Sequence, residues 1–374
     1  MRRCSYGLAQ LGHFVLRCRG RARRRIALSV VLLPWLLVSL PLPPDLGPQG
    51  DLSLPSALAL MPDTPEIRAA GVWYADYALA ERVYGVEGVK SMTDTRISRF
   101  LGAIVALHPG PETGVSSLAL GRWQQVYGYD LFSLSAEIYT TGGGAPSHDL
   151  GVVTGQLDPS YIAHQLATTG YTPTLVGPDR LFIRWPLPPG SMPGHAMNVI
   201  SLPGHLLVAG AWTTDVLTAT TRLRQGSGLL AGDAQVRLLA AALGTVQGAF
   251  LAQHNAESPG IGLSVPGLHK GARLHQYSLY ATAYQEPRPG QRFMEIALAY
   301  ARRADALADA ATLRTRLAQE MLPIYGAPWR RLVAVSSVSA QGSNLVIRLR
   351  LRPTTSPLLW QDVVVEGGLS ILTP

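Results

Sequence analysis

Apolar residues recur at helical spacing in several short stretches of the chain. One stretch ends at Pro109-Gly110, which does not continue a helix, and its apolar residues lie one to four positions apart: Ile97, Phe100, Leu101, Ile104 and Leu107. Thr64-Pro65 has the composition of a helix cap followed by a first turn. The pattern therefore predicts helices that begin near residue 64 and near residue 97.

Later helices carry signals at their ends. Asp158-Pro159 supplies an N-cap and a first helical residue, and Gly170 follows the last turn. Asp233 and Gly244 bracket a second helix in the same way, and Gly226 ends the helix over 213–225. A longer helix is predicted from about residue 305 to 321, with an inner face formed by Leu307, Ala310, Leu313, Leu317 and Met321.

Short apolar runs between turn residues predict strands. Hairpins are expected around Gly177-Pro178-Asp179, Pro203-Gly204 and Gln341–Asn344, with further strands over 150–155, 273–285 and 291–301. Strands flank single helices in both halves of the chain. We therefore predict an α+β fold with domains at 64–245 and 246–374, each with helices packed on an antiparallel or mixed sheet. Ferredoxin-like repeats would fit this order.

The N-terminus has the pattern of a membrane-targeting segment. Residues 1–25 contain eight arginines and no acid, and the uncharged run Ile26–Leu42 follows. The first Ala-x-Ala is Ala57-Leu58-Ala59, well beyond that run, so we favour an uncleaved signal anchor over a cleaved signal peptide. The prediction is a single-pass cell-membrane protein with a cytoplasmic leader (1–25), a transmembrane anchor (26–42), a Pro/Gly-rich tether (43–63) and an extracytoplasmic remainder; secretion is the alternative.

The charge distribution argues against nucleic-acid binding. The chain has a net charge of +8, but the leader holds eight of its 32 basic residues. The rest carries 24 basic and 24 acidic residues, so no basic excess remains for a nucleic acid. Both cysteines, Cys4 and Cys18, lie in the leader, so the predicted exported part contains no disulfide.

Three stretches within about 61–225 are informative: Met61–Tyr77, Gly128–Tyr139 and Leu150–Tyr171. They resemble a group of uncharacterised bacterial proteins that are anchored in the membrane and exposed outside the cytoplasm. In that group a "Gly-x-Leu-Asp … Leu … Gly-Tyr" unit forms strand, helix and strand. The resemblance implies a location and an architecture, and it implies no activity.

Two nearly identical pentapeptides end in His195 and His205, which raises the question of a metal site. A strand over Ala196–Leu202 would hold the two imidazoles roughly 20 Å apart, too far to share an ion. His269 and His275 would be about as far apart if they lay on a strand. If they lay on a helix, they would point to different faces. We therefore expect no metal and no cofactor, and we expect Pro203-Gly204 to form a type II turn.

No catalytic motif stands out. The serine segments lack the Gly-x-Ser-x-Gly pattern, and the glycine-rich stretch 140–146 lacks the Gly-Lys-Ser/Thr ending of a phosphate loop. An unrecognised Ser-His-Asp arrangement stays open, because the chain has 9 histidines.

Four aromatic residues are the candidate binding residues. Trp73, Tyr77 and Tyr84 are spaced by four and seven positions, which on a helix places them on one stripe, and Tyr74 is adjacent. Such a stripe either packs the helix on a sheet or forms a groove for a protein or polysaccharide partner.

Together these patterns predict a membrane-anchored extracytoplasmic protein with a binding or structural role and no enzymatic activity. The alternatives are a subunit of a membrane protein complex and an exported hydrolase with a site between the two halves.

Overall fold

The computed structural model describes residues 52–110, 120–141, 149–184, 197–255, 261 and 272–374. Residues 42–374 form one compact unit. The described α-helices are α1 Leu54–Leu58, α2 Pro65–Ala70, α3 Tyr77–Tyr84, α4 Ile97–Val105, α5 Leu120–Tyr127, α6 Pro159–Thr168, α7 Thr213–Gln225, α8 Ala234–Leu243, α9 Arg303–Gln319, α10 Trp329–Leu332 and α11 Leu359–Val365.

Strands of both halves of the chain form one 12-stranded sheet within the described residues, and all its pairings are antiparallel. Its order is β13-β14-β10-β9-β8-β1-β2-β3-β7-β6-β5-β4, and β11 and β12 form a separate pair. The strands are β1 Val72–Asp76, β2 Leu134–Thr140, β3 Leu150–Gly155, β4 Thr172–Val176, β5 Asp179–Ile183, β6 Val199–Ser201, β7 Leu206–Gly210, β8 Gly248–Gln253, β9 Tyr277–Gln285, β10 Phe293–Tyr300, β11 Met321–Leu322, β12 Ala327–Pro328, β13 Val333–Gln341 and β14 Asn344–Leu351.

The strand order repeats on either side of the centre of the sheet. From β1 outward the order is β1-β2-β3-β7-β6, and from β8 outward it is β8-β9-β10-β14-β13. The α+β class is therefore confirmed, and the boundary expected between residues 245 and 246 falls where the second series begins. The two halves share a single sheet, however, because β1 pairs with β8. The ferredoxin-like form of the repeat stays a prediction.

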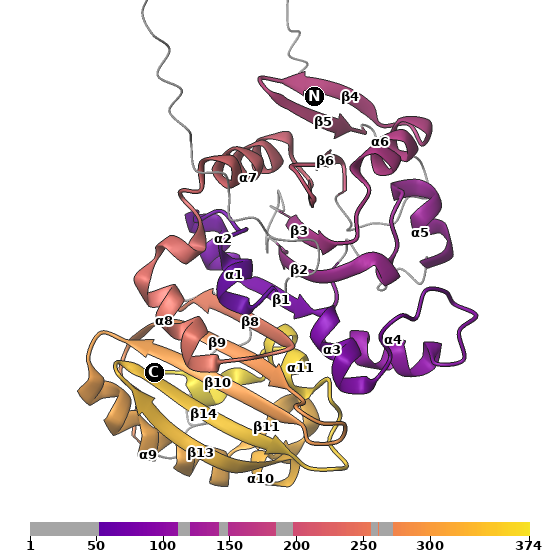
Figure 1. Cartoon of the computed structure of the whole chain (residues 1–374). Helices are drawn as coiled ribbons and strands as arrows, with labels where there is room; N and C mark the ends of the chain where they lie inside the picture. Colours follow the sequence, from indigo (N-terminus) through magenta and orange to yellow (C-terminus); the bar gives the residue numbers. More distant parts are fainter. Residues whose placement is uncertain (1–51, 111–119, 142–148, 185–196, 256–260, 262–271) are drawn as a thin grey trace, which may run out of the picture. The chain divides into compact units, whose positions relative to one another are not determined.

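Two apolar layers cover the two faces of the sheet. Successive residues of β1 point to opposite faces, so Trp73 belongs to one core cluster and Tyr74 to the other. Buried residues of α3, α4, α6, α9 and α11 pack in the Trp73 cluster, and those of α1, α2, α7 and α8 pack in the Tyr74 cluster. Each face of the sheet is thus buried by helices (Figure 1).

The predicted helix caps are confirmed. The Thr64 side chain accepts a hydrogen bond from the Ile67 amide, and Asp158 and Asp233 each accept two amide hydrogen bonds in the first turns of α6 and α8. Gly226 ends α7 in the left-handed conformation, with φ of 61°. These ends were predictable because capping depends on residues that are adjacent in sequence.

The predicted tether over 43–63 is too long. Residues 43–51 lie outside the described part, but the remainder contains α1 and packs in the core. It contains a set of fully or almost fully buried apolar side chains: Leu52, Leu54, Ala57, Leu58, Leu60 and Met61. This segment therefore belongs to the folded domain.

The inner face of α9 also differs from the prediction. Leu313 and Leu317 are buried and Ala310 is nearly so, but Leu307 is 53% exposed and Met321 lies beyond the helix end on β11, 49% exposed. Ala306 takes the inward position, since each residue turns by about 100° around the helix axis and Leu307 is one step further round.

The hairpin between β6 and β7 is confirmed, but its turn is shifted by one residue. The Leu206 amide donates to the Pro203 carbonyl at 3.1 Å, so Gly204 and His205 are the two central residues. Gly204 has φ of +62° and occupies the first central position, which is typical of a type II′ hairpin turn and not of the predicted type II turn.

No helix among the described residues is long and apolar enough to cross a membrane. The predicted leader and the anchor at 26–42 lie outside these residues.

Candidate functional site

The four predicted aromatic residues do not form a helical stripe. Trp73 and Tyr74 lie on β1, and Tyr77 and Tyr84 are the first and last residues of α3. The spacing was misleading because Asp76 ends the strand and caps the helix, so no single helix spans the four. Trp73, Tyr74 and Tyr77 are buried and Tyr84 is partly buried. A binding role for these rings stays a prediction.

Two of the four aromatic residues, Tyr74 and Tyr84, donate hydrogen bonds to other parts of the domain. Tyr74 donates a hydrogen bond to the Leu52 carbonyl, which ties β1 to the segment before α1. Tyr84 and Tyr284 both donate to Oε2 of the buried Glu286. The Gly290 amide donates to the other oxygen of Glu286, so this carboxylate is well satisfied inside the protein.

The other two aromatic residues meet a polar group near the centre of the sheet, which we call the His108 cluster: Trp73, Tyr77, His108, Glu137 and Tyr139. Tyr77 donates to Oε2 of the fully buried Glu137 at 2.5 Å, and the Gly110 amide donates to the same oxygen at 2.9 Å. A Cβ on Gly110 would lie 2.5 Å from Glu137 Oε1, so only glycine fits there.

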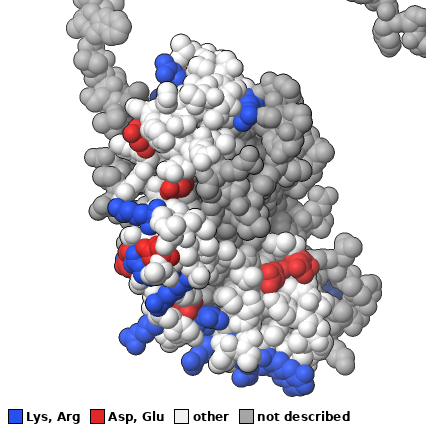
Figure 2. All heavy atoms as spheres, turned by 90° about the vertical axis from the view of Figure 1, so that its right-hand side faces the viewer, with Lys and Arg blue, Asp and Glu red and all other residues white. Residues whose placement is uncertain are grey.

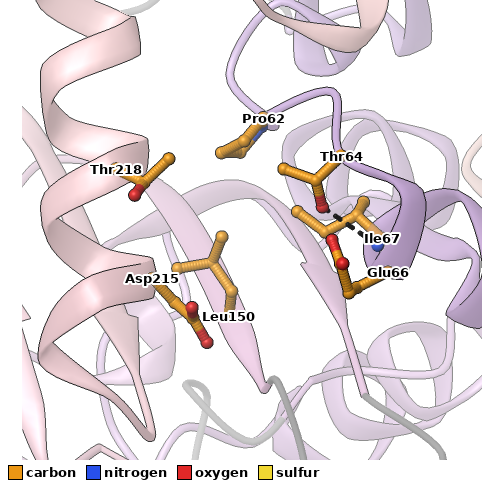
Figure 3. Close-up of a pocket in the computed structure, with 7 residues that line it drawn as sticks. All are labelled: Pro62, Thr64, Glu66, Ile67, Leu150, Asp215 and Thr218. Carbon is orange, nitrogen blue, oxygen red and sulfur yellow. Dashed lines mark hydrogen bonds between the residues drawn. The ribbon is translucent and has the colours of Figure 1, made fainter.

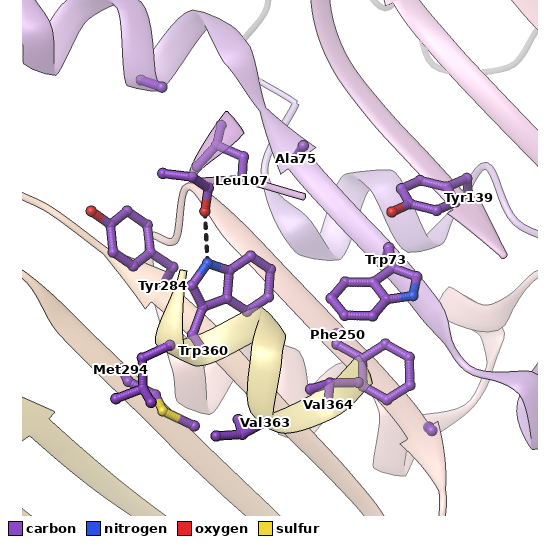
Figure 4. Close-up of a cluster of buried hydrophobic side chains, with 14 of the residues drawn as sticks. Trp73, Ala75, Leu107, Tyr139, Phe250, Tyr284, Met294, Trp360, Val363 and Val364 are labelled. Atoms are coloured by element: carbon purple, nitrogen blue, oxygen red, sulfur yellow. Dashed lines mark hydrogen bonds between the residues drawn. The ribbon is translucent and has the colours of Figure 1, made fainter. Parts of the chain in front are cut away.

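His108 adopts an unusual backbone conformation. It is the only non-glycine residue with positive φ in the part of the chain that the structure describes, at φ of 57°. Its ring stacks on Trp73 with centroids 3.9 Å apart and planes 14° apart. Figure 4 shows Trp73 and Tyr139 beside the side chains of Phe250 and Trp360, which come from the second half. The cluster therefore lies at the β1–β8 boundary.

The Tyr139 hydroxyl contacts two groups of His108. It is 2.9 Å from the His108 carbonyl, to which it can donate, and it also contacts Nδ1 of the ring, whose donor or acceptor role depends on the tautomer. Burial lowers the pKa of His108 to about 4, so the ring is neutral near pH 7. A neutral imidazole has one ring nitrogen that can accept a hydrogen bond or a proton.

A second histidine forms a pair with buried carboxylates. The backbone amide and Nδ1 of His275 contact the two oxygens of Asp309 at 2.8 and 2.7 Å, and Nε2 lies 3.9 Å from Asp305. Asp309 is 2% exposed and the imidazole is 46% exposed. The hydrogen bond to Asp309 raises the pKa of His275. This pair fastens the segment before β9 to α9.

Of His195, His205 and His269, only His205 lies within the described residues. His205 occupies the exposed second position of the β6–β7 turn, and His195 and His269 lie outside the described residues. Within the described residues, no group of three His, Cys, Asp or Glu side chains could hold a metal ion.

Two cavities border the helices on the Tyr74 side of the sheet. The first, of about 210 Å³, lies between α2 and α7 above Leu150; Figure 3 shows Glu66 and Asp215 on opposite walls, with Thr64 and Thr218. Both carboxylates lie in the first turns of their helices, where negative charge complements the helix dipole. The second, of about 470 Å³, lies between α1, the β1–α3 junction and the end of α8.

Exposed charge is strongly one-sided in the second half. Among described residues from 246 onward, Glu366 is the only exposed acid, because Glu286, Glu295, Asp305, Asp309 and Glu320 are buried and Asp362 is half-buried. Nine arginines are exposed there: Arg273, Arg288, Arg302, Arg303, Arg314, Arg330, Arg331, Arg350 and Arg352. Figure 2 shows basic side chains at its lower end, the level of α9, α10 and β13 in Figure 1. The net charge of the sequence does not reveal this surface, because it counts buried acids and exposed arginines equally.

Comparisons with protein-family models, curated proteins and solved structures found no match. The resemblance to membrane-anchored bacterial proteins therefore stays a prediction.

Proposed function

We propose that the chain is a membrane-anchored extracytoplasmic protein that binds a negatively charged partner. The leader and the apolar run Ile26–Leu42 would place residues from 43 onward outside the cytoplasm. The arginine-rich surface of the second half would form the binding face. The observation that carries the binding role is the contrast between nine exposed arginines and one exposed acid in the described part of that half.

The position of α1 supports an uncleaved anchor. Cleavage after the first Ala-x-Ala, Ala57-Leu58-Ala59, would remove α1 and with it the buried side chains of Leu54 and Leu58. The core around Tyr74 would lose part of its packing. A chain that retains the anchor at 26–42 also retains α1, so its core stays complete.

Retention on an anionic polymer tests the binding role. Because residues 42–374 form one compact unit, a soluble chain over 43–374 keeps every described residue. It should be retained on immobilised polyglutamate at low salt, released at high salt, and pass a neutral dextran column freely. Replacement of Arg330, Arg331 and Arg352 by Gln should abolish retention.

A matched variant controls for total charge. Replacing Arg96, Arg99 and Arg180 by Gln removes the same number of exposed charges from the first half and should leave retention unchanged. Equal losses in both variants, or no retention of the unmodified chain, would refute a dedicated binding surface.

The predicted orientation has its own test. A reporter that fluoresces only in the cytoplasm, fused after Pro374, should stay dark in the full chain while the protein remains in the membrane fraction. A bright reporter would overturn the extracytoplasmic location, and release of the protein on washing would favour the secreted alternative.

The His108 cluster favours a second candidate function, the exported hydrolase. It places a neutral histidine, which has one ring nitrogen able to accept a proton, at the boundary between the two halves. Such a group can act as a general base. Hydrolysis of a panel of model esters by residues 43–374, lost in a folded His108→Asn variant, would support it; equal turnover in both proteins would exclude a role for His108.

A further inference from the structure

The exposed arginines are concentrated where α9, α10 and β13 meet, which we call the arginine corner: Arg314, Arg330, Arg331 and Arg352. Arg352 Nε donates to the Arg330 carbonyl at 3.0 Å, which holds the end of β14 beside α10. Arg314 Nη2 donates to the Val338 carbonyl at 3.0 Å, which links α9 to β13. All four side chains are exposed; Arg330, Arg331 and Arg352 lie together beside α10, and Arg314 lies further along β13.

Two aliphatic side chains are exposed at the same corner. Met321 is 49% exposed, and its strand β11 pairs with Pro328 directly before α10. Val335 is 43% exposed and follows α10 on β13. Exposed apolar area is unfavourable in water, by about 25 cal/mol per Å², and it becomes favourable when a partner covers it.

Three acids lie near this corner. Glu320 is 7% exposed and lies 3.9 Å from the buried Arg316. Asp362 accepts a hydrogen bond from Tyr325, between β11 and β12, and the exposed Glu366 also acts electrostatically on Tyr325. Arg316 is itself directed inward, where it donates to the carbonyls of Ala272, Ile371 and Thr373. The exposed charges of the corner are therefore mainly positive, with four arginines against Glu366, and they lie beside exposed aliphatic groups.

This combination distinguishes two kinds of anionic partner. A soluble polyanion attracts the arginines and leaves Met321 and Val335 in water. A bilayer surface attracts the arginines through its anionic headgroups and also receives the aliphatic groups at the headgroup–acyl boundary.

We propose that the arginine corner binds anionic lipid headgroups and that Met321 and Val335 enter the bilayer interface. The inference rests on the proposed function, because it names the anionic partner of the same surface. The predicted anchor would keep this surface close to lipid and raise its effective concentration, so weak contacts are sufficient.

Vesicle sedimentation tests the inference. Residues 43–374 should sediment with vesicles of phosphatidylcholine and phosphatidylglycerol, and remain in the supernatant with phosphatidylcholine alone. Each arginine contributes about fivefold to affinity, so the change of Arg330, Arg331 and Arg352 to Gln should weaken binding roughly 100-fold. The variant with Arg96, Arg99 and Arg180 changed to Gln should bind as the unmodified chain does.

A second variant separates lipid from other anions. Met321→Ser with Val335→Ser keeps every charge, so it should lose vesicle binding severalfold and keep normal retention on polyglutamate. Thermal melts of all variants should show that they remain folded.

Each outcome has a defined meaning. Retention on polyglutamate without binding to anionic vesicles would overturn the lipid inference and leave the proposed function intact. Failure to bind either one would overturn both. Unchanged vesicle binding in the Met321/Val335 variant would show that the corner does not enter the interface, which also refutes the inference as stated.

Discussion

His108 has its main chain in the left-handed region and its imidazole in a half-buried stack on Trp73. Asn tolerates that backbone conformation and carries no titrating ring, so His108→Asn removes the ionisable group at a small backbone cost. A comparison of His108→Asn with the unmodified protein therefore measures how the titration of one buried histidine affects stability.

Stability should fall as the pH drops below about 6.5, in part because of His108. Its pKa is lowered from 6.5 to about 4, so the unfolded chain binds the proton first and folding becomes less favourable through that interval. The contribution is on the order of 3 kcal/mol and is complete below about pH 4. Urea unfolding at about pH 7 and pH 4.5 should show a smaller acid loss in His108→Asn than in the unmodified chain.

The exposed His205 provides the control for this comparison. His205→Asn should follow the unmodified protein at both pH values, since its side chain lies at the surface of the β6–β7 turn. An acid loss of equal size in all three proteins would contradict the role assigned to His108.

Gly204 shows how one residue can set a hairpin. A Cβ at this position would have no heavy atom within 4 Å, so steric conflict with other residues is not the constraint. The positive φ is the constraint, and Gly204→Val should cost about 1–3 kcal/mol of unfolding free energy. Thermal melts should show His205→Ala within about 0.5 kcal/mol of the unmodified protein; a harmless Val would disprove the turn.

Among the secondary-structure elements, α1 is the one whose packing bears most directly on whether the N-terminal segment is cleaved. Leu58 is fully buried, and Leu58→Ala should cost about 2–5 kcal/mol through lost packing. A chain starting at Leu60 lacks α1 entirely and should be less stable than Leu58→Ala. Urea midpoints of both proteins against residues 43–374 measure this order, and an equally stable chain from Leu60 would remove the structural support for an uncleaved anchor.

The elements that the sequence revealed are those with local signals. Asp158 and Gly170 mark α6 from both ends, and Gly177-Pro178 marks the β4–β5 turn. The β1–α3 junction was misread because a strand passes directly into a helix at Asp76, which leaves no loop residue as a signal. In α9, the shift from Leu307 to Ala306 was hidden because alanine is a weak apolar marker.

The polar clusters could not be found from sequence in the same way. Glu137 receives hydrogen bonds from Tyr77 and Gly110, which are 60 and 27 residues away. His108 is held by Tyr139, 31 residues away. Only the fold brings such groups together, and the same holds for the arginine corner, whose residues come from α9, α10 and the end of β14.

At the scale of the whole molecule, one continuous sheet predicts one unfolding transition. Trp73 contacts Phe250 and Trp360, and Trp360 donates to the Ala106 carbonyl at 2.7 Å, so both halves share core contacts. Circular dichroism and tryptophan fluorescence should therefore report the same midpoint in urea for residues 43–374. Chains over 43–245 and 246–374 should each fail to fold stably, and two separate transitions would show that the halves are independent.

The pairing of β1 with β8 imposes an order of events on the growing polypeptide. β1 is made early, and β2 follows within the same half, but the neighbour on its other side is not completed until Gln253. At synthesis rates of 5–20 residues per second, the middle of the sheet keeps an open hydrogen-bonding edge for on the order of ten seconds. Unpaired strand edges recruit other chains, so every nascent molecule passes through an interval in which its central strand is its most vulnerable one.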